Sequence, residues 1–279
     1  VKGLPQGNTP KAAPSPTPAA AQSPVPSPQS SPFTLSVERI LVENGTVTLP
    51  SRQNQNALSV TGITADAAVM LSGSTIQIPT IEATARLNGA HPLSLTAKDF
   101  AFSLSESVLR APSILISGDS GAVQGSAVLQ IASQEGQIVA SSDSINLSTL
   151  ASNIKDAAPV FAALKPSGRA SFSAKATLRS NLAPLIDASV TPKDVGVTLS
   201  GGEQVTKLSG LVKATGASDN LTVSTQALSF SYQNAPLKLD AALVVSPKGV
   251  DVTTLNIQGF GGQISLPAKL TQGKPGTLT

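Results

Sequence analysis

The chain is poor in the residues that enzymes and cofactor-binding proteins use for chemistry. Its 279 residues include no cysteine, no tryptophan and one histidine, His91. Charged residues make up 13% and aromatic residues 3%, so small and β-branched side chains carry most of the sequence. A core built from such residues is thin, as between sheet faces, because few large rings are available to fill a globular centre. The lack of cysteine fits an oxidising compartment and a cytosolic protein equally well.

Basic residues are scattered, and the net charge is only +3. No stripe of lysine and arginine with interleaved aromatic residues is present, so nucleic acid is not an expected partner. No apolar run approaches the roughly 20 residues that cross a bilayer as a helix, and no signal peptide is apparent.

No residue pattern predicts a catalytic, cofactor-binding or metal site. His91 precedes Pro92 in a predicted loop, without cysteine or an acidic partner at a motif spacing. The glycine-rich segments 201–202 and 259–262 lack the Lys-Ser/Thr pair of a phosphate-binding loop, so turns or bulges explain them better. The isolated aspartates do not form a calcium loop. We therefore expect a protein that is not an enzyme and needs no cofactor.

Residues 1–32 contain 9 of the 21 prolines, set among alanine, serine and glutamine. Such a segment buries too little apolar surface to offset its ordering entropy. We expect a proline-rich linker, followed by a β domain over residues 33–279.

From residue 33 onward apolar and polar residues alternate, with short turns between runs, which predicts antiparallel strands in a mainly β fold. A phase shift at Glu38-Arg39 predicts a bulge, and Asn44-Gly45 predicts a hairpin turn because both residues tolerate positive φ. Residues 50–56 are expected to form a polar loop.

The periodicity becomes helical once. Apolar residues recur at helical spacing over 147–165, with Ser148 as the expected cap and Pro166 and Gly168 at the end. Pro159 inside this run predicts two short helices rather than one.

The β pattern also repeats, since segments near residues 45, 60, 93 and 121 recur in the same order near 196, 210, 237 and 262. This predicts two related halves, 33–146 and 169–270, joined by a helical connector, 147–165. Corresponding strands carry one apolar and one polar face. A one-sided strand needs a cover, which is a second sheet, a helix or a ligand. The alternation alone favours a closed sandwich.

Four segments resemble the C-terminal β region of the AsmA family of Gram-negative envelope proteins. They are the opening run 33–49 with its Asn-Gly, the entry to the helical connector 144–150, the return to the sheet 165–172, and the glycine-marked segment 255–264. Together they cover most of residues 33–270.

The resemblance implies a long, curved antiparallel sheet forming a groove with an apolar interior, and it reverses the preference for a sandwich. It also implies a location in the periplasm and a role in phospholipid movement and outer-membrane biogenesis. We expect the chain to be part of a longer protein whose inner-membrane anchor lies outside it. The residues expected to face lipid are Leu93, Leu95, Phe100, Phe102, Leu104, Phe172, Leu237, Leu239 and Leu243. The alternative is a structural scaffold or adhesin-like module with a dry core.

Overall fold

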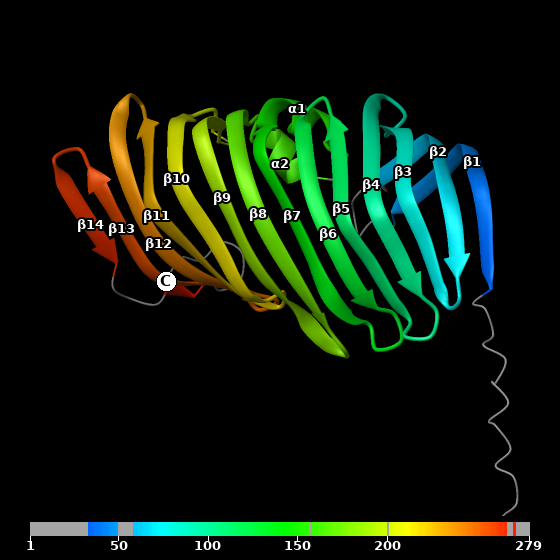
Figure 1. The fold of residues 1–279 in the computed structure, drawn as a ribbon. Coiled ribbons are helices and arrows are strands. Elements are labelled where there is room, and N and C mark those ends of the chain that lie inside the picture. Colours follow the sequence, from blue (N-terminus) through cyan, green and yellow to red (C-terminus); the bar gives the residue numbers. More distant parts are fainter. Residues whose placement is uncertain (1–32, 50–57, 157, 200, 267–269, 272–279) are drawn as a thin grey trace, which may run out of the picture. The chain divides into compact units, whose positions relative to one another are not determined.

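The computed structural model describes residues 33–49, 58–156, 158–199, 201–266 and 270–271. These residues form one antiparallel sheet in which each strand pairs with the next along the chain, from β1 to β14 (Figure 1). The predicted linker, 1–32, and the predicted loop, 50–56, lie outside the described residues.

The strands are long and follow one another without crossovers. The first seven are β1 (Thr34–Leu49), β2 (Leu58–Ser72), β3 (Thr75–Leu87), β4 (His91–Ser103), β5 (Val108–Gly118), β6 (Gly121–Gln130) and β7 (Glu135–Asn146). After the helices come β8 (Ser167–Arg179), β9 (Leu182–Thr198), β10 (Gln204–Ala217), β11 (Asn220–Tyr232), β12 (Ala235–Ser246), β13 (Gly249–Gly259) and β14 (Gly262–Leu266). A short β15 (Leu270–Thr271) pairs with β13.

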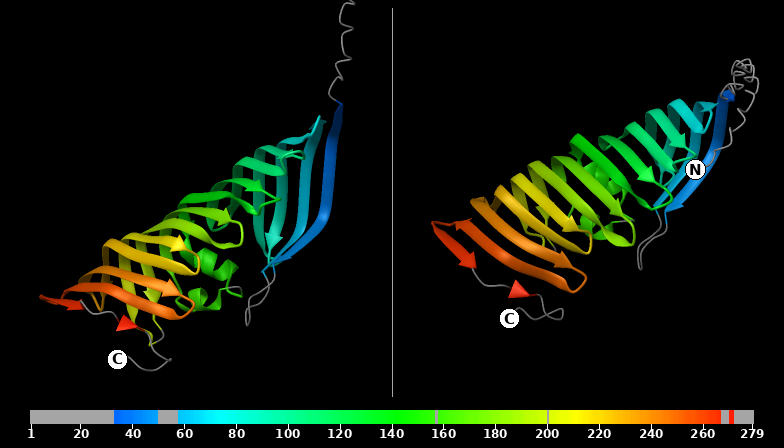
Figure 2. Two further views of the ribbon diagram at one scale, coloured as in Figure 1. Left: turned by 90° about the horizontal axis from the view of Figure 1, so that it is seen from below. Right: turned by 60° about the horizontal axis from the view of Figure 1, so that its bottom comes forward.

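The sheet is curved and open, which is the architecture that the family resemblance implied and not the sandwich that the alternation alone favoured. Figure 2 shows the curved strands side by side, so that the sheet encloses a long open groove. In the described part of the chain β1 and β14 do not pair with each other, and no second sheet is present. The closed sandwich is therefore not the fold of these residues.

The curvature comes from irregularities in the middle of the strands. In β4, Lys98 and Asp99 are consecutive exposed residues, and Asp99 has a left-handed φ of 55°. Lys193-Asp194 in β9 repeats this arrangement, with a φ of 52° at Asp194. Two successive side chains then lie on the same face, and the strand bends away from that face. The face opposite these exposed pairs becomes the concave one.

The hairpin predicted at Asn44-Gly45 is wrong, because β1 runs through it as one strand. Asn44 does have a left-handed φ of 56°, but the register shifts on both sides of Gly45 show a bulge within the β1–β2 ladder. Positive φ is needed by a tight turn and by a bulge alike, so the dipeptide did not distinguish them. The bulge predicted at Glu38-Arg39 is confirmed by the register shift between Val37 and Ile40.

The matched segments of the internal repeat lie on strands that are eight apart in the sheet. The segment near residue 45 ends β1 and its counterpart near 196 ends β9, while those near 93 and 237 begin β4 and β12. The correspondence thus relates β1–β6 to β9–β14. Strands β7 and β8 flank the helical connector between the two halves.

The helical connector contains α1 (Leu147–Asn153) and α2 (Pro159–Ala163), so the division at Pro159 is confirmed. The predicted cap is wrong: Asn146 Oδ1 accepts a hydrogen bond from the Thr149 backbone N–H at 3.2 Å, and Ser148 donates its own hydroxyl to the same oxygen at 2.8 Å. Asparagine is as good a cap as serine, and it stands one residue before the helix. No helix among the described residues has the length and apolarity needed to cross a bilayer.

Two long-range hydrogen bonds tie the connector to the sheet. Asn88, in the β3–β4 turn, donates from Nδ2 to the Asn153 carbonyl at 3.1 Å. At the other end, the Thr198 N–H in β9 donates to the Leu164 carbonyl at 2.7 Å. The helices lie near the upper edge of the sheet in Figure 1, on its concave side. The connector therefore links strands of the first half to strands of the second.

We expect Asn88→Asp to loosen this connector. In the unaltered chain the Ser59 N–H donates a hydrogen bond to Asn88 Oδ1 at 3.2 Å. Aspartate can still accept this bond, but it has no N–H group to donate to the Asn153 carbonyl. The expected loss is about 1 kcal/mol of local stability. Hydrogen exchange should become faster in residues 147–163 and stay unchanged in β10–β13, whereas unchanged exchange in the helices would show that the tether is dispensable.

Candidate functional site: the apolar face of the sheet

The strand register aligns most of the apolar residues of neighbouring strands on one face. In the first half, Leu95 of β4 lies between Ala83 of β3 and Ile116 of β5. In the second half, Leu239 of β12 lies between Leu228 of β11 and Ile257 of β13. Partners that lie opposite each other share a face, so these rows join into a continuous apolar strip.

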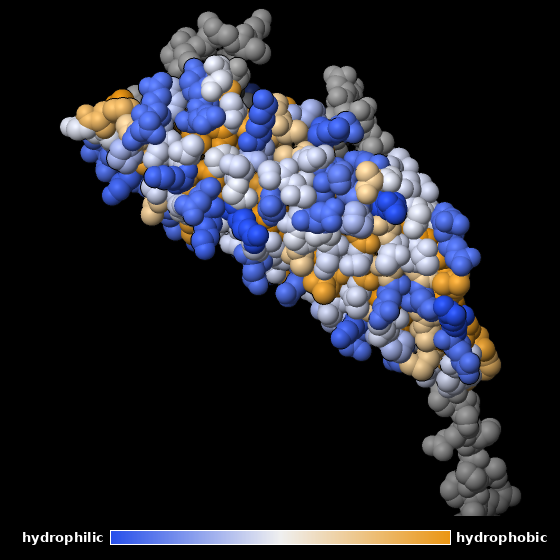
Figure 3. Space-filling view, turned by 90° about the horizontal axis from the view of Figure 1, so that it is seen from above, coloured by the Kyte–Doolittle hydropathy of each residue, from blue (hydrophilic) through white to orange (hydrophobic). Residues whose placement is uncertain are grey.

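This apolar face is the concave one. The strand bends place pairs such as Lys98-Asp99 on the opposite side, and the charged neighbours of the β12 leucines, Lys238 and Asp240, are exposed there too. Figure 3 looks down on the convex side, which carries mostly hydrophilic and neutral residues. Hydrophobic residues show mainly between the polar ones and at the β1 end.

Curvature buries side chains that no second layer covers. No large side chain among the described residues is fully enclosed. Apart from Leu182 at the start of β9, however, the large apolar residues within strands β4–β12 are at least half-buried by their neighbours. Half of the most buried apolar positions are alanines, and most of them lie where the strands bend or beside the helices. The most buried apolar positions are Ala97, Ala111, Ile145, Ala151, Ala170, Val195, Leu228 and Leu237.

The polar groups on this face are satisfied within the sheet. Ser142 is buried and donates its hydroxyl to the Ala122 carbonyl at 2.5 Å. Thr225 donates to the Leu239 carbonyl at 3.2 Å and accepts from the Ala241 N–H at 2.8 Å. Among the described residues no buried side-chain N or O atom lacks a partner. The face therefore offers hydrocarbon and little else, because its hydroxyls are already bonded to backbone.

The residues predicted to face lipid lie along this strip in three groups. Four of them lie on β4, opposite isoleucine and alanine residues of β3; they are Leu93, Leu95, Phe100 and Phe102. Phe172 lies on β8 opposite Ser142 and Val190. Leu237, Leu239 and Leu243 lie on β12, opposite Phe230, Leu228 and Val223. The structure places Leu104 in the turn after β4, where it is exposed.

Sequence reasoning missed much of the same face. It did not single out β1, whose apolar residues form one end of the strip: Leu35, Val37, Ile40, Val42 and Val47. It also named no lipid-facing residue on β9 or on β13. The signal was present as alternation, but the phase changes at each bend hid it, and Pro184 and Pro192 made β9 unlike a strand.

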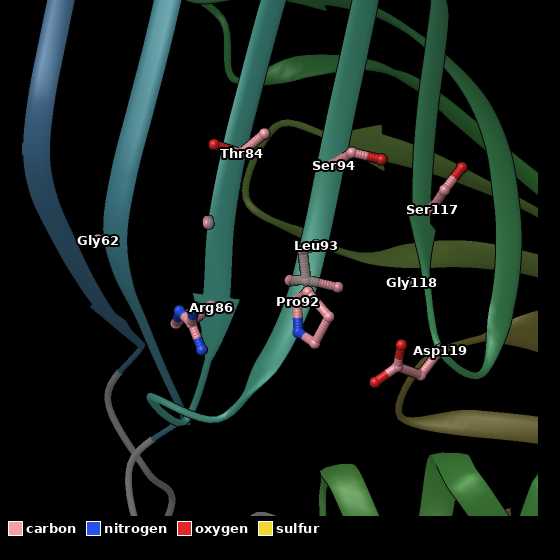
Figure 4. A pocket seen from close by; sticks show the side chains of 10 residues that line it. Gly62, Thr84, Arg86, Pro92, Leu93, Ser94, Ser117, Gly118 and Asp119 are labelled. Carbon is pink, nitrogen blue, oxygen red and sulfur yellow. The ribbon is translucent and has the colours of Figure 1, made fainter.

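The described residues of the convex face line several shallow depressions. One of about 500 Å³ lies at the ends of β2–β5 (Figure 4). It is lined by Gly62, Thr84, Ala85, Arg86, Pro92, Leu93, Ser94, Ser117, Gly118 and Asp119. In Figure 4, Arg86 and Asp119 lie on either side of Pro92. A lone cation beside a carboxylate does not define an anion site.

A second depression on the convex face, of about 470 Å³, includes a surface ion pair. Arg39 Nη2 lies 2.7 Å from Asp66 Oδ2, and the hydrogen bond to Asp66 raises the pKa of Arg39 above its ordinary value. Both side chains are largely exposed, so we read the pair as a cross-strand contact that adds little stability. Among the described residues no cluster of three histidine, cysteine or acidic side chains is placed to hold a metal.

Comparison with known proteins gives no assignment: no family, no curated protein and no solved structure matches the chain.

Proposed function

We propose that this chain is a non-catalytic module that holds or conducts phospholipid acyl chains along the concave face of its sheet. The observation that supports this most directly is the continuous apolar strip, which lies on one open layer and whose hydroxyls are internally bonded. A face of this kind gains free energy only from an apolar ligand, at roughly 0.8 kcal/mol per methylene buried.

The dimensions suit a lipid better than a small molecule. Fourteen strands in sequence have thirteen spacings, which at about 4.8 Å each give a strip of about 60 Å. That is about four times the hydrocarbon thickness of one leaflet, half of ~30 Å. The strip therefore has room for several acyl chains in succession, which is what conduction along the groove requires.

The envelope location belongs to the proposal as well. The four segments that resemble the AsmA family support a periplasmic module, anchored in the inner membrane by a part of the protein outside this chain and serving outer-membrane biogenesis. Which phospholipid is carried, and in which direction, depends on that larger protein.

Lipid content tests the proposal directly. The chain is produced in the periplasm of a Gram-negative host, purified without detergent, and its organic extract is analysed by mass spectrometry. We expect phospholipid at about one or more molecules per chain, because each buried acyl chain contributes several kcal/mol. A folded, monodisperse protein without lipid would contradict the proposal and favour the structural scaffold instead.

A further inference from the structure

The apolar face ends differently at its two long edges. At the lower edge in Figure 1, four large apolar residues lie at the ends of strands or in the turns between them. These residues are between 49% and 69% exposed. We call them the lower-rim cluster: Phe33, Leu104, Ile131 and Leu182.

Two members of the lower-rim cluster, Leu104 and Ile131, continue the concave face outward. Leu104 follows Phe102 by two residues, and Ile131 follows Leu129 by two, which is the spacing of side chains on one face of a strand. The pairing also continues past the strand ends: the Leu104 N–H donates to the Ser74 carbonyl and the Ile131 N–H to the Ser107 carbonyl, both at 2.8 Å. The strip therefore reaches the rim without a polar break.

The upper edge continues the apolar face at fewer places. At the β5–β6 and β13–β14 turns the last paired positions on the apolar face are glycines, Gly118 with Gly121 and Gly259 with Gly262. Between them, α1 contacts the upper ends of β7 and β8. At these places the apolar strip is closed by helices or ends without side chains. The large exposed apolar residues of this edge are Val160 in α2, Phe260 in the β13–β14 turn and Leu199 directly after β9.

The lower edge is also weakly charged. Its turns are rich in serine, and two acidic residues, Glu106 and Glu135, and Arg179 are its charged side chains on the β4–β9 side. Arg179 is occupied locally, since its Nε donates to the Ala183 carbonyl at 3.2 Å. A partner that binds here does so through apolar contact rather than through attraction of charge.

We propose that the lower-rim cluster contacts the surface of a phospholipid bilayer, and that acyl chains enter the concave face across this rim. The second part rests on the proposed function. The cluster forms a row rather than a compact patch, because its members lie at the ends of strands that are two or three positions apart in the sheet, about 10–15 Å. A row of exposed tips fits a lipid surface, into which each side chain inserts separately, better than it fits a protein interface, which needs a contiguous area of about 800 Å² per partner.

Vesicle flotation with the whole 279-residue chain tests the contact. The vesicles contain only phosphatidylcholine, so charge attraction is absent. The variant carries Leu104→Ser, Ile131→Ser and Leu182→Ser together. Its matched control carries Val160→Ser and Phe260→Ser, which remove apolar residues that are 78% and 74% exposed, in α2 and in the β13–β14 turn of the upper edge.

We expect the triple variant to float at least about tenfold less than the unaltered chain, and the control to float normally, at low and at high salt. If the triple variant does not fold, its three single substitutions replace it, each with an expected loss of about two- to threefold.

An unaltered chain that stays with the soluble fraction overturns the proposed bilayer contact, as does an equal loss of flotation in the control. If the chain carries lipid but does not float with vesicles, the proposed contact between the lower-rim cluster and the bilayer is wrong and the proposed function is unaffected. Flotation of a chain that never carries lipid would support the rim contact and overturn the proposed function, together with entry across the rim.

Discussion

Leu239→Asp is expected to lower the lipid recovered with the purified chain at least about tenfold, because an ionised carboxylate is costly to place against hydrocarbon. Leu239 lies on the concave face between Leu228 and Ile257, so the new charge would face the middle of the strip. The measurement is the molar ratio of phospholipid to protein in the extract.

The control for this substitution is the adjacent residue. Lys238→Asp introduces the same carboxylate one position away, on the exposed convex face of the same strand. Lipid content should stay unchanged in this variant, and circular dichroism should show equal strand content in both. Equal loss in the two variants would mean that the substitutions disturb the sheet, and unaltered lipid in Leu239→Asp would place the lipid somewhere other than this face.

Gly210→Ala is expected to destabilise the sheet by roughly 2–4 kcal/mol, through backbone strain and overpacking together. Gly210 has a φ of 134°, which favours glycine, and a Cβ there would lie 2.7 Å from both the Ala227 oxygen and the Leu228 Cα. The register between β10 and β11 shifts between Ser209 and Leu211, the interval that contains Gly210. The bend of β11 at Gln226-Ala227 therefore needs a residue without a side chain opposite it.

Gly262→Ala is the matched control for the Gly210 prediction. Nothing lies within 4 Å of a Cβ at Gly262, and its φ is not in the left-handed region. Chemical denaturation should show a change within about 0.5 kcal/mol for Gly262→Ala and a clearly lower midpoint for Gly210→Ala. Equal midpoints would show that the backbone relaxes around Gly210 and that this bend does not depend on glycine.

The two stability predictions and the lipid prediction examine different properties of one sheet. Asn88→Asp tests whether the helical connector is held to the β3–β4 turn, and Gly210→Ala tests how a strand bends. Leu239→Asp tests what the bent face is for. A variant that loses lipid but keeps its fold would show that lipid binding and the stability of the sheet depend on different residues.

Much of the local structure follows from the sequence alone. Alternation identifies most strands, and proline at 159 divides the helical connector, because proline begins a helix far better than it continues one. The sequence also contains the repeat that relates β1 to β9 and β4 to β12. These features depend on neighbours in the chain, so they can be read without knowing the fold.

Other features depend on partners that are distant in the chain. Asn44-Gly45 has the positive φ that its sequence favours, but whether that becomes a turn or a bulge depends on whether β2 pairs past it, as it does here. Leu104 continues the apolar alternation of β4, yet the strand ends at Ser103 and leaves Leu104 on the rim. No local pattern fixes where pairing stops.

By itself the sequence determined that this protein is an antiparallel β chain with one apolar and one polar face, interrupted once by a helical connector. It left open whether two such faces close on each other as a sandwich or remain as one curved strip, since both arrangements use the same alternating residues. Only the tertiary structure decided this. Each strand pairs with its sequence neighbour and bends at pairs such as Lys98-Asp99, so the apolar face curls on itself and stays open along its length.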